Sequence, residues 1–404
     1  MKKNYVRQIF QSVMLVAIAF SLVIPSAIAA DPIKIGLMQG LSGPYEVYAK
    51  QEITGFKMGL EWATKGTNKI LGRDVKLFIE DTQLKPARGK MLLNKLYSDD
   101  KVDLVVGPTS SGVALACLPV AQQFKKVLIV EPAVADAITG SKWNRYIFRT
   151  GRNSGQDAIG NAAAVAGPGV SIACIGQDYA FGRDGIAAYK KAAEKLGAKV
   201  VQSEFCDPKA TDFTAPIQRL INALKDKPSP KYIFVIWAGK GPPTTQLQQS
   251  GLDKHGIVLT SGANVFPVLK LWKKINLKGM VGAAYYYYEC PKNPVNDWFV
   301  KEHLKRFKNT PPDFFTCGGF AAAMAVVKGI TKAGGTDTEK LISAMEGMVF
   351  MTPKGTMIFR KEDHQALQSM FAFKLEIKPD VEWAVPTLLR EMSPAETAPP
   401  ILVK

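Results

Sequence analysis

The stretch that decides the fold is Asp103-Leu-Val-Val-Gly-Pro-Thr-Ser-Ser-Gly112, a short apolar run that ends in glycine, proline and hydroxyl residues. Such a run predicts a buried strand, and a hydroxyl pair that opens the next segment predicts a capped helix. The same layout recurs at Val127-Leu-Ile-Val-Glu-Pro-Ala133. A buried strand, a small-residue turn and a further element are typical of a parallel sheet with helices on its faces.

Outward from this stretch, short apolar runs alternate with segments of helical period. The expected strands are Ile33–Met38, Val75–Glu80, Leu104–Gly107, Val127–Val130, Ser171–Ile175, Lys199–Phe205, Tyr232–Trp237, Ile257–Leu259 and Phe371–Leu375. The expected helices are Glu52–Lys65, Lys85–Ser98, Ala114–Phe124, Gly185–Leu196, Phe213–Ala223 and Phe320–Thr331. Because the alternation occurs twice, the sequence predicts an α/β protein with two lobes of similar plan.

The composition is that of a globular protein. The chain has 404 residues, of which 47% are hydrophobic and 22% charged, and two domains are expected at roughly 100–200 residues each. The formal net charge of +17 is spread along the chain, without a basic run or an aromatic-basic motif. We therefore interpret the charge as solvated surface with a mild bias toward anionic ligands, and expect no nucleic-acid partner.

The N-terminus reads as a secretory signal. A basic start between Lys2 and Arg7 precedes the apolar run Ser12–Ile24, and small residues follow. This pattern predicts a signal peptide over residues 1–29, cleaved after Ala29, and a periplasmic mature protein; an uncleaved anchor helix is the alternative. Later in the chain we expect no stretch that inserts into a membrane.

The five cysteines and three histidines do not indicate a metal site or a catalytic site. None of the cysteines forms a Cys-x-x-Cys pair, which argues against zinc and thioredoxin-like chemistry. Cys117 and Cys174 lie in apolar stretches and are expected in the core, whereas Cys290 and Cys317 flank a polar segment and are the best candidates for a disulfide. The histidines are interpreted as surface residues; they are His255, His303 and His364.

No enzyme motif stands out. The chain lacks a Gly-x-Ser-x-Gly elbow, a phosphate loop ending in Gly-Lys-Ser/Thr and a His-Glu-x-x-His pair. We therefore expect no catalytic residues, no cofactor and no metal.

Ligands of open α/β sheets sit beyond the carboxyl ends of the strands, so the turn after Leu104–Gly107 is the most informative part of the chain. Its residues Thr109, Ser110 and Ser111 open a helix. They can cap the free amides of that helix, or these amides and hydroxyls can hold a carboxylate at the positive end of the helix dipole. We favour the ligand contact.

An ordered set of short motifs resembles the periplasmic solute-binding proteins of ATP-driven importers, in the leucine/isoleucine/valine-binding class. The motifs are Ile33-Lys-Ile-Gly-Leu, Ser42-Gly-Pro, Asp81-Thr-Gln, Gly107-Pro-Thr-Ser-Ser-Gly, Phe148-Arg-Thr and Tyr179-Ala-Phe-Gly-Arg-Asp-Gly. The resemblance covers nearly the whole mature chain. It implies two Rossmann-like lobes joined by a three-strand hinge, with a ligand cleft between them. We place lobe 1 at residues 30–150 plus 282–357, and lobe 2 at 151–281 plus 358–404.

The resemblance also implies ligand contacts at positions that match the family's motifs. The family's ligand serine matches Ser111, with Ser110 beside it, and the backbone positions near the carboxylate match Ala133 and Ala135. The remaining candidates are the aromatic residues Tyr48, Tyr179, Phe181 and Tyr288, and the polar residues Asn153, Lys240 and Asn264.

The predicted ammonium end of the site departs from the family pattern. The family places acids near Asn153 and near Ala263-Asn264, and neither position holds an acid here. An ammonium buried without a countercharge is costly, so we expect a ligand with a carboxylate and without an ordinary ammonium site, such as an aromatic or other organic acid. In the alternative interpretation, the ligand is an amino acid and the acid comes from elsewhere in the chain, namely Asp178, Asp184 or Glu289.

These expectations define a function. The chain is predicted to be a monomeric binding protein that delivers a small carboxylate-bearing ligand to the membrane permease subunits of an ABC importer, after its lobes close on the ligand. The alternatives are a ligand-sensing module of the same fold and, less favoured, a periplasmic enzyme.

Overall fold

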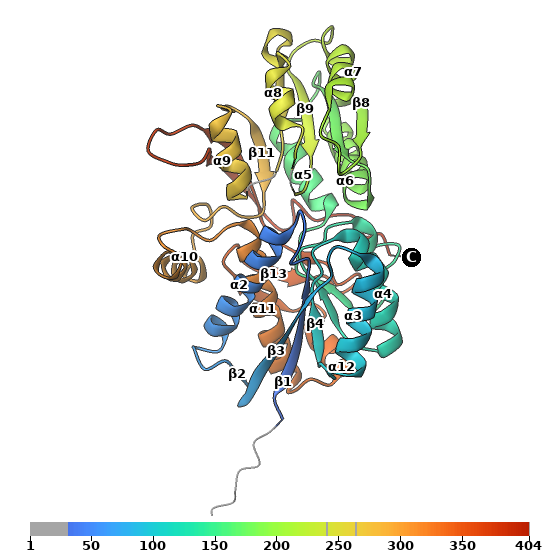
Figure 1. Ribbon diagram of the computed structural model, residues 1–404, viewed down its shortest axis with the longest axis vertical. Coiled ribbons are helices and arrows are strands. Elements are labelled where there is room, and N and C mark those ends of the chain that lie inside the picture. Colours follow the sequence, from blue (N-terminus) through green and yellow to red (C-terminus); the bar gives the residue numbers. More distant parts are fainter. Residues whose placement is uncertain (1–30, 240, 263–264, 404) are drawn as a thin grey trace, which may run out of the picture. The chain divides into compact units, whose positions relative to one another are not determined.

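The computed structural model describes residues 31–239, 241–262 and 265–403, and the strands in these ranges form three sheets (Figure 1). The predicted signal peptide and the predicted ligand residues Lys240 and Asn264 lie outside the described residues.

The first sheet has the strand order β2-β3-β1-β4-β5-β6. Its strands are β1 (Ile33–Gln39), β2 (Lys69–Ile70), β3 (Arg73–Asp81), β4 (Leu104–Val106), β5 (Leu128–Val130) and β6 (Ile147–Arg149). All neighbours pair in parallel except the short hairpin of β2 with β3. Leu96 of helix α3 (Pro86–Ser98) contacts one face of β1 at Gly36. Phe56 of helix α2 (Glu46–Ala63) lines a small hollow together with Leu37, the next residue of β1, whose side chain lies on the other face. Helices therefore cover both faces of this sheet, as its apolar strands predict.

The second sheet has the order β16-β15-β11-β10-β9-β7-β8. Its strands are β7 (Ser171–Gln177), β8 (Lys199–Cys206), β9 (Lys231–Ile236), β10 (Ile257–Thr260), β11 (Val281–Ala284), β15 (Met370–Glu376) and β16 (Val385–Met392). Side chains of β7 alternate: Ile172 and Cys174 join the apolar cluster of helices α5 (Ser154–Val165) and α6 (Ala180–Lys195), whereas Ala173 and Ile175 join that of α7 (Thr214–Leu224). Figure 1 shows these helices around β8 and β9.

The remaining elements connect and cover the sheets. They are α4 (Ser111–Phe124), α8 (Thr244–Gln249), α9 (Phe266–Lys274), α10 (Pro294–Arg306), α11 (Phe314–Ala333), α12 (Thr338–Met345), the 3-10 helices η1 (Asp136–Thr139) and η2 (Leu252–His255), and a small antiparallel sheet of β12 (Val349–Thr352), β13 (Gly355–Phe359) and β14 (Ala366–Leu367). The chain crosses between the lobes after β6, after β11 and after β14; the strands that follow β11 form the small sheet, and β15 and β16 rejoin the second large sheet. The predicted two-lobed α/β fold is therefore confirmed; the lobe limits by residue stay a prediction, and the limit between 281 and 282 falls inside β11.

One feature of the second sheet differs from the expected parallel sheets. Strands β15 and β16 run antiparallel, so this sheet is mixed. Strand β11 ends at Ala284, and the three residues that follow it, Tyr285, Tyr286 and Tyr287, are all buried.

The structure also corrects the predictions for two of the cysteines and two of the histidines. The structure describes Cys290 and Cys317 as buried free thiols, so the predicted disulfide is wrong, while Cys117 and Cys174 lie in the core as predicted. His303 and His364 are buried instead of on the surface. His364 stacks on Phe148 with 3.9 Å between ring centroids, and burial lowers the pKa of its imidazole. Its role is therefore that of a packed core residue.

Helix α11 corrects the expectation that no later segment could span a membrane. It is the one helix among the described residues that is long and apolar enough for a span. Most of this helix is covered by the rest of the protein, however, because 83% of its most apolar 18-residue stretch is buried. The length and composition of a core helix of this size match those of a spanning helix.

Glycines allow α2 and α11 to approach closely. A methyl group added at Gly319 of α11 would lie 2.0 Å from the backbone oxygen of Glu52 of α2. One added at Gly55 of α2 would lie 1.8 Å from the backbone oxygen of Thr316. Such distances are sterically impossible, so the absence of side chains at these positions sets the distance between the helices.

We predict that Gly319→Ala destabilises the protein, although alanine is the better helix former by about 1 kcal/mol. Helix α2 must move away from the added methyl group, and overpacking of this kind costs about 1–3 kcal/mol. Urea unfolding followed by circular dichroism measures the difference. Gly335→Ala is the control, because nothing lies within 4 Å of its added methyl group; equal stability of the two variants would contradict this account of the helix contact.

Candidate functional site

Two adjoining hollows form one cleft at the ends of the strands. The larger encloses about 590 Å³ of space between atoms and the smaller about 340 Å³, part of it open to solvent. The two hollows share five of their lining residues and are therefore continuous. The shared residues are Tyr48, Arg152, Phe181, Ala238 and Phe315. We call the two hollows together the cleft.

The smaller hollow is lined by hydroxyl groups. Ser111 opens α4, and its Oγ accepts hydrogen bonds from the amides of Val134 at 3.3 Å and Ala135 at 3.2 Å. Thr109 lines the same hollow, and its Oγ1 accepts from the Gly40 amide at 3.0 Å and donates to Gln39. These bonds fix the turn after β5 against the start of α4. The helix N-terminus and its hydroxyls thus lie where an anion would be stabilised.

Aromatic rings line the rest of the cleft. Tyr48 of α2 and Phe315 of α11 lie with their ring centroids 4.3 Å apart, so the close contact of these two helices positions both rings. Phe181 from α6 lines both hollows, and Trp237 after β9 lines the larger one. Such walls favour a ligand with a flat or apolar body.

Arg152 is the one cationic side chain among the described lining residues of the cleft. Its Nε donates to Asp157 Oδ1 at 3.2 Å, and Asp157 Oδ2 lies 3.1 Å from the same nitrogen. The guanidinium carbon lies 5.0 Å from the ring centroid of Phe314, 5.3 Å from that of Tyr285 and 6.0 Å from that of Phe315. A guanidinium tolerates such a site because it is weakly hydrated and stacks on aromatic faces.

Burial opposes both charges of the pair formed by Arg152 and Asp157. For Asp157 burial is the largest effect and raises the pKa of the carboxyl, although the arginine lowers it. For Arg152 the charges of Asp157 and its other neighbours outweigh burial and raise the pKa of the guanidinium. The neighbours of Arg152 thus favour its charged form, whereas burial favours the neutral form of Asp157.

Most of the predicted ligand residues lie in or beside the cleft, and one lies elsewhere. Ser111, Ala133, Tyr48, Phe181 and Tyr179 line the cleft. Ser110 and Ala135 are buried beside it, at the start of α4 and in the turn after β5. Tyr288 is half-buried elsewhere, where its hydroxyl donates to Glu289 at 2.8 Å.

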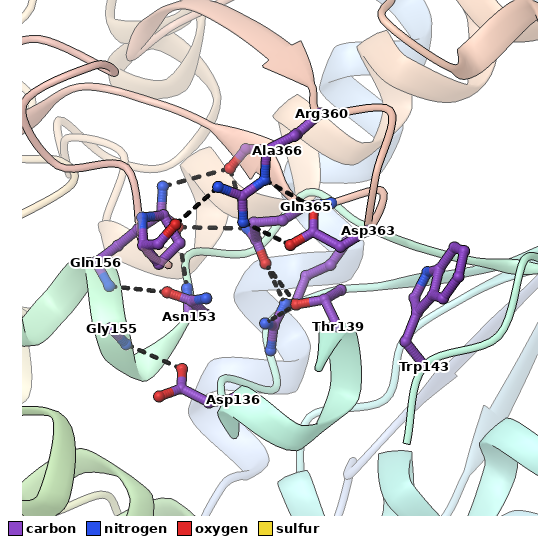
Figure 2. Close-up of polar contacts among 12 residues, drawn as sticks. Asp136, Thr139, Trp143, Asn153, Gly155, Gln156, Arg360, Asp363, Gln365 and Ala366 are labelled. Atoms are coloured by element: carbon purple, nitrogen blue, oxygen red, sulfur yellow. Dashed lines mark hydrogen bonds and ion pairs between the residues drawn. The ribbon is translucent and has the colours of Figure 1, made fainter. Parts of the chain in front are cut away.

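Asn153 serves the structure of α5 instead of presenting its side chain to the cleft. Its Oδ1 accepts from the amide of Gln156 at 2.8 Å, while the Gln156 side chain accepts from the amide of Asn153 at 3.1 Å (Figure 2). This reciprocal pair is a capping box, so the Oδ1 of Asn153 that could accept from a ligand ammonium already has a partner.

The acids proposed as alternatives also have other partners. Asp178 forms an ion pair with Arg183 at 2.5 Å, and Glu289 bonds to Tyr288. Asp184 of α6 accepts from the Asp136 amide of η1 at 3.2 Å. Among the described residues, the acid that does line the cleft is Asp157. Sequence reasoning missed it and Arg152; the available signal was the cationic residue in the crossover segment Arg149-Thr-Gly-Arg152, followed five residues later by an acid on the next helix.

Bonds cross the cleft between elements of the two lobes. The hydroxyls of Tyr45 on α2 and Tyr179 before α6 lie 2.6 Å apart. The Gly239 amide donates to the Tyr48 hydroxyl at 2.9 Å, in addition to the bond from Asp136 to Asp184. Asp136 itself accepts from the Gly155 amide at the start of α5 at 3.0 Å (Figure 2). Direct contacts thus hold the two walls of the cleft together.

The model of the periplasmic binding protein family matches residues 32–380. The chain therefore belongs to this family of solute-binding proteins, as its motifs and its two-lobed fold predict.

Three similar proteins are described by the class of transporter to which they belong or by the ligand that they bind. A structure from Rhodopseudomonas palustris CGA009, described as an ABC-type branched-chain amino acid transporter, is 57% identical, covers 92% of this chain and 100% of its own, and has a TM-score of 0.84. The solute binding protein of an ABC transporter from Rhodopseudomonas palustris HaA2, in complex with p-hydroxybenzoic acid, is 26% identical over 92% of this chain and 98% of its own, with a TM-score of 0.78. The leucine-, isoleucine-, valine-, threonine-, and alanine-binding protein of Pseudomonas aeruginosa is 26% identical over 82% of this chain and 87% of its own.

A second group of buried charges lies behind the cleft. Glu52, Glu131 and Lys354 are each at most 2% exposed, and among the described residues their charged side-chain atoms have no hydrogen-bond partner within 3.5 Å and in good geometry, although the Thr150 hydroxyl stabilises the carboxylate of Glu131. Burial raises the pKa of both carboxyls and lowers that of the lysine. The ammonium lies 4.1 Å from the ring centroid of Tyr285 and provides positive charge for both carboxyls.

We predict that Lys354→Met destabilises the protein by about 3–5 kcal/mol, because it leaves buried carboxyls without their countercharge. The pKa of these carboxyls, already raised above the unfolded value, then rises further. Folding therefore costs more as they ionise, and the deficit should be larger at pH 8 than at pH 5. Urea unfolding at both pH values measures it, with the exposed Lys361→Met as control; a deficit that is equal at both pH values would contradict the argument.

Proposed function

We propose that this protein captures a small carboxylate-bearing solute, an aromatic acid in the first place, and delivers it to the membrane permease of an ABC importer. The observation that carries the proposal is the buried guanidinium of Arg152, which lines both hollows of the cleft among aromatic rings. A buried cation in a site for solutes favours a ligand with a negative charge.

The chemistry of the cleft matches the two parts of an aromatic acid. Arg152 and the start of α4 at Ser111 supply positive potential for the carboxylate. The rings of Tyr48, Phe181 and Phe315 supply apolar walls for the body of the ligand. The p-hydroxybenzoic acid in the relative from Rhodopseudomonas palustris HaA2 supports this ligand class.

A branched-chain amino acid is the second candidate. Its supporting observation is Asp157, an acid that lines the cleft and could accept a hydrogen bond from an ammonium. The described specificity of the relatives from Rhodopseudomonas palustris CGA009 and Pseudomonas aeruginosa favours the same class. In either case, ligand contacts from both walls of the cleft would add to the bonds that already cross it and stabilise the closed state, whose surface the permease recognises.

A thermal-shift panel tests the ligand class, since a ligand that binds only the native state raises the melting temperature. Benzoate, 4-hydroxybenzoate, leucine, isoleucine and alanine are compared at equal concentration. We expect larger shifts with the aromatic acids than with the amino acids. A shift with leucine and none with either aromatic acid would replace the first candidate by the second, and mass spectrometry of the recovered ligand would reveal any turnover by an enzyme.

The variant Ser111→Ala is predicted to weaken binding of the best ligand of the panel by about 1.5–3 kcal/mol, the range for a hydrogen bond to a charged group. This is roughly a tenfold to hundredfold loss of affinity in isothermal titration calorimetry. Ser98→Ala, at the exposed end of α3, is the matched control. An unchanged affinity in a folded Ser111→Ala protein would remove Ser111 from the binding site.

A further inference from the structure

We propose that Asp157 determines the charge class of the ligand, because its carboxylate competes with a ligand carboxylate for Arg152. The inference rests on the proposed function, in that it assumes that the cleft takes a small solute at Arg152. It adds a specificity-determining residue that the match to the family's motifs does not indicate.

Asp157 occupies one hydrogen-bond donor of the Arg152 guanidinium, the Nε group. Both of its oxygens lie at the Nε edge of Arg152, at 3.2 and 3.1 Å. Arg152 Nη1 points to the carbonyl of Pro132 at 3.5 Å, and Nη2 takes part in none of the hydrogen bonds between described residues. Nη2 is the nitrogen next to Nε on the guanidinium. Since Arg152 lines both hollows, its Nη2 donors remain for a ligand anion, which would then lie beside the carboxylate of Asp157.

The position of Asp157 is set by α5 and not by the ligand. It lies in the first turn of this helix, four residues after Asn153, whose capping box fixes the start of the helix. Its side chain is only 19% exposed, so water screens its charge poorly. The pair of Arg152 and Asp157 is therefore a preformed, formally neutral unit in the wall of the cleft.

A formally neutral pair is expected to bind anionic and zwitterionic ligands with different affinities. A monocarboxylate that bonds to Arg152 brings a second negative charge close to Asp157, and two carboxylates that share a poorly hydrated site repel each other. A zwitterionic amino acid brings a negative and a positive group, so its net charge matches that of the pair. Compared with a site that held Arg152 alone, Asp157 thus lowers the affinity for an anion and raises that for a ligand that also carries a positive group.

Proton uptake is the consequence for an anionic ligand. Besides Arg152, the charged groups that act on Asp157 are Lys354 of the β12–β13 turn, Arg149 at the end of β6 and Asp136 of η1. Burial already raises the pKa of Asp157, and a bound anion would raise it further. At pH values between the pKa of Asp157 in the free protein and its higher pKa in the complex, binding of the anion takes up a proton. The affinity for the anion therefore falls as the pH rises through this interval.

The test is Asp157→Asn, which keeps an oxygen for Arg152 and removes the charge. Isothermal titration calorimetry with 4-hydroxybenzoate and with leucine is carried out from pH 6 to pH 8.5, in phosphate and in Tris, because buffers of different ionisation enthalpy report proton uptake. For the variant we expect an affinity for 4-hydroxybenzoate at least about tenfold higher at pH 8 and independent of pH, no proton uptake, and weaker binding of leucine. Asp226→Asn, an exposed aspartate of the same lobe, should behave as the unmodified protein.

The outcomes separate this inference from the proposed function. If the unmodified protein binds leucine only and Asp157→Asn loses it, the aromatic-acid proposal fails while the role of Asp157 stands. If the protein binds 4-hydroxybenzoate and the folded variant shows the same affinity and the same pH profile, the inference is overturned and the proposed function stands. Should Asp157→Asn fail to fold, Asp157→Ser removes the same charge in a smaller side chain, and the same two results decide.

Discussion

The structure of the cleft depends on one buried charge, that of Arg152. A guanidinium with little access to water needs partners on every side, and here an aspartate at one edge and three aromatic rings provide them. The rings come from segments far apart in the sequence, the end of β11 and the start of α11. Arg152 itself follows β6 and Tyr285 follows β11, so two of the three crossings between the lobes meet at this side chain, which ties the chemistry of the cleft to the folding of the whole chain.

The scaffold places this charge opposite a helix terminus. Glycines bring α2 and α11 together, and this contact aligns Tyr48 with Phe315 at the cleft. On the other side, Ser111 binds the amides of Val134 and Ala135 and holds the turn after β5 against α4. The same serine oxygen that fixes the turn lies beside the ligand space, so structural and binding roles of Ser111 share one atom.

Sequence patterns predicted the elements of the sheets well, because apolar runs and turn residues are local signals. The strand predicted at Leu104–Gly107 is observed at Leu104–Val106, and the helix predicted at Ala114–Phe124 begins three residues earlier. Predictions failed where burial depends on distant parts of the chain. His364 looks like a surface residue in its charged surroundings, but it packs on Phe148, more than two hundred residues away.

In the candidate site, too, residues in local motifs were predicted, whereas residues that depend on distant parts of the chain were not. Ser111, Tyr48 and Phe181 were expected from motifs and line the cleft. Asn153 was expected there as well, but its place at the start of α5 engages it in a cap. Arg152 and Asp157 were missed because their importance arises from rings at the end of β11 and the start of α11, and no local pattern around residue 152 carries that information.

The recognition of a negative charge by Arg152 is tested most directly with two ligands of nearly equal shape. Calorimetric titration of the protein with 4-hydroxybenzoate and with its neutral amide, 4-hydroxybenzamide, compares a charged with an uncharged head group on the same ring. The account predicts that the acid binds at least about a hundredfold more tightly, since a hydrogen bond to a charged group is worth about 1.5–3 kcal/mol and more than one is available here. Equal affinities for the acid and the amide would contradict it.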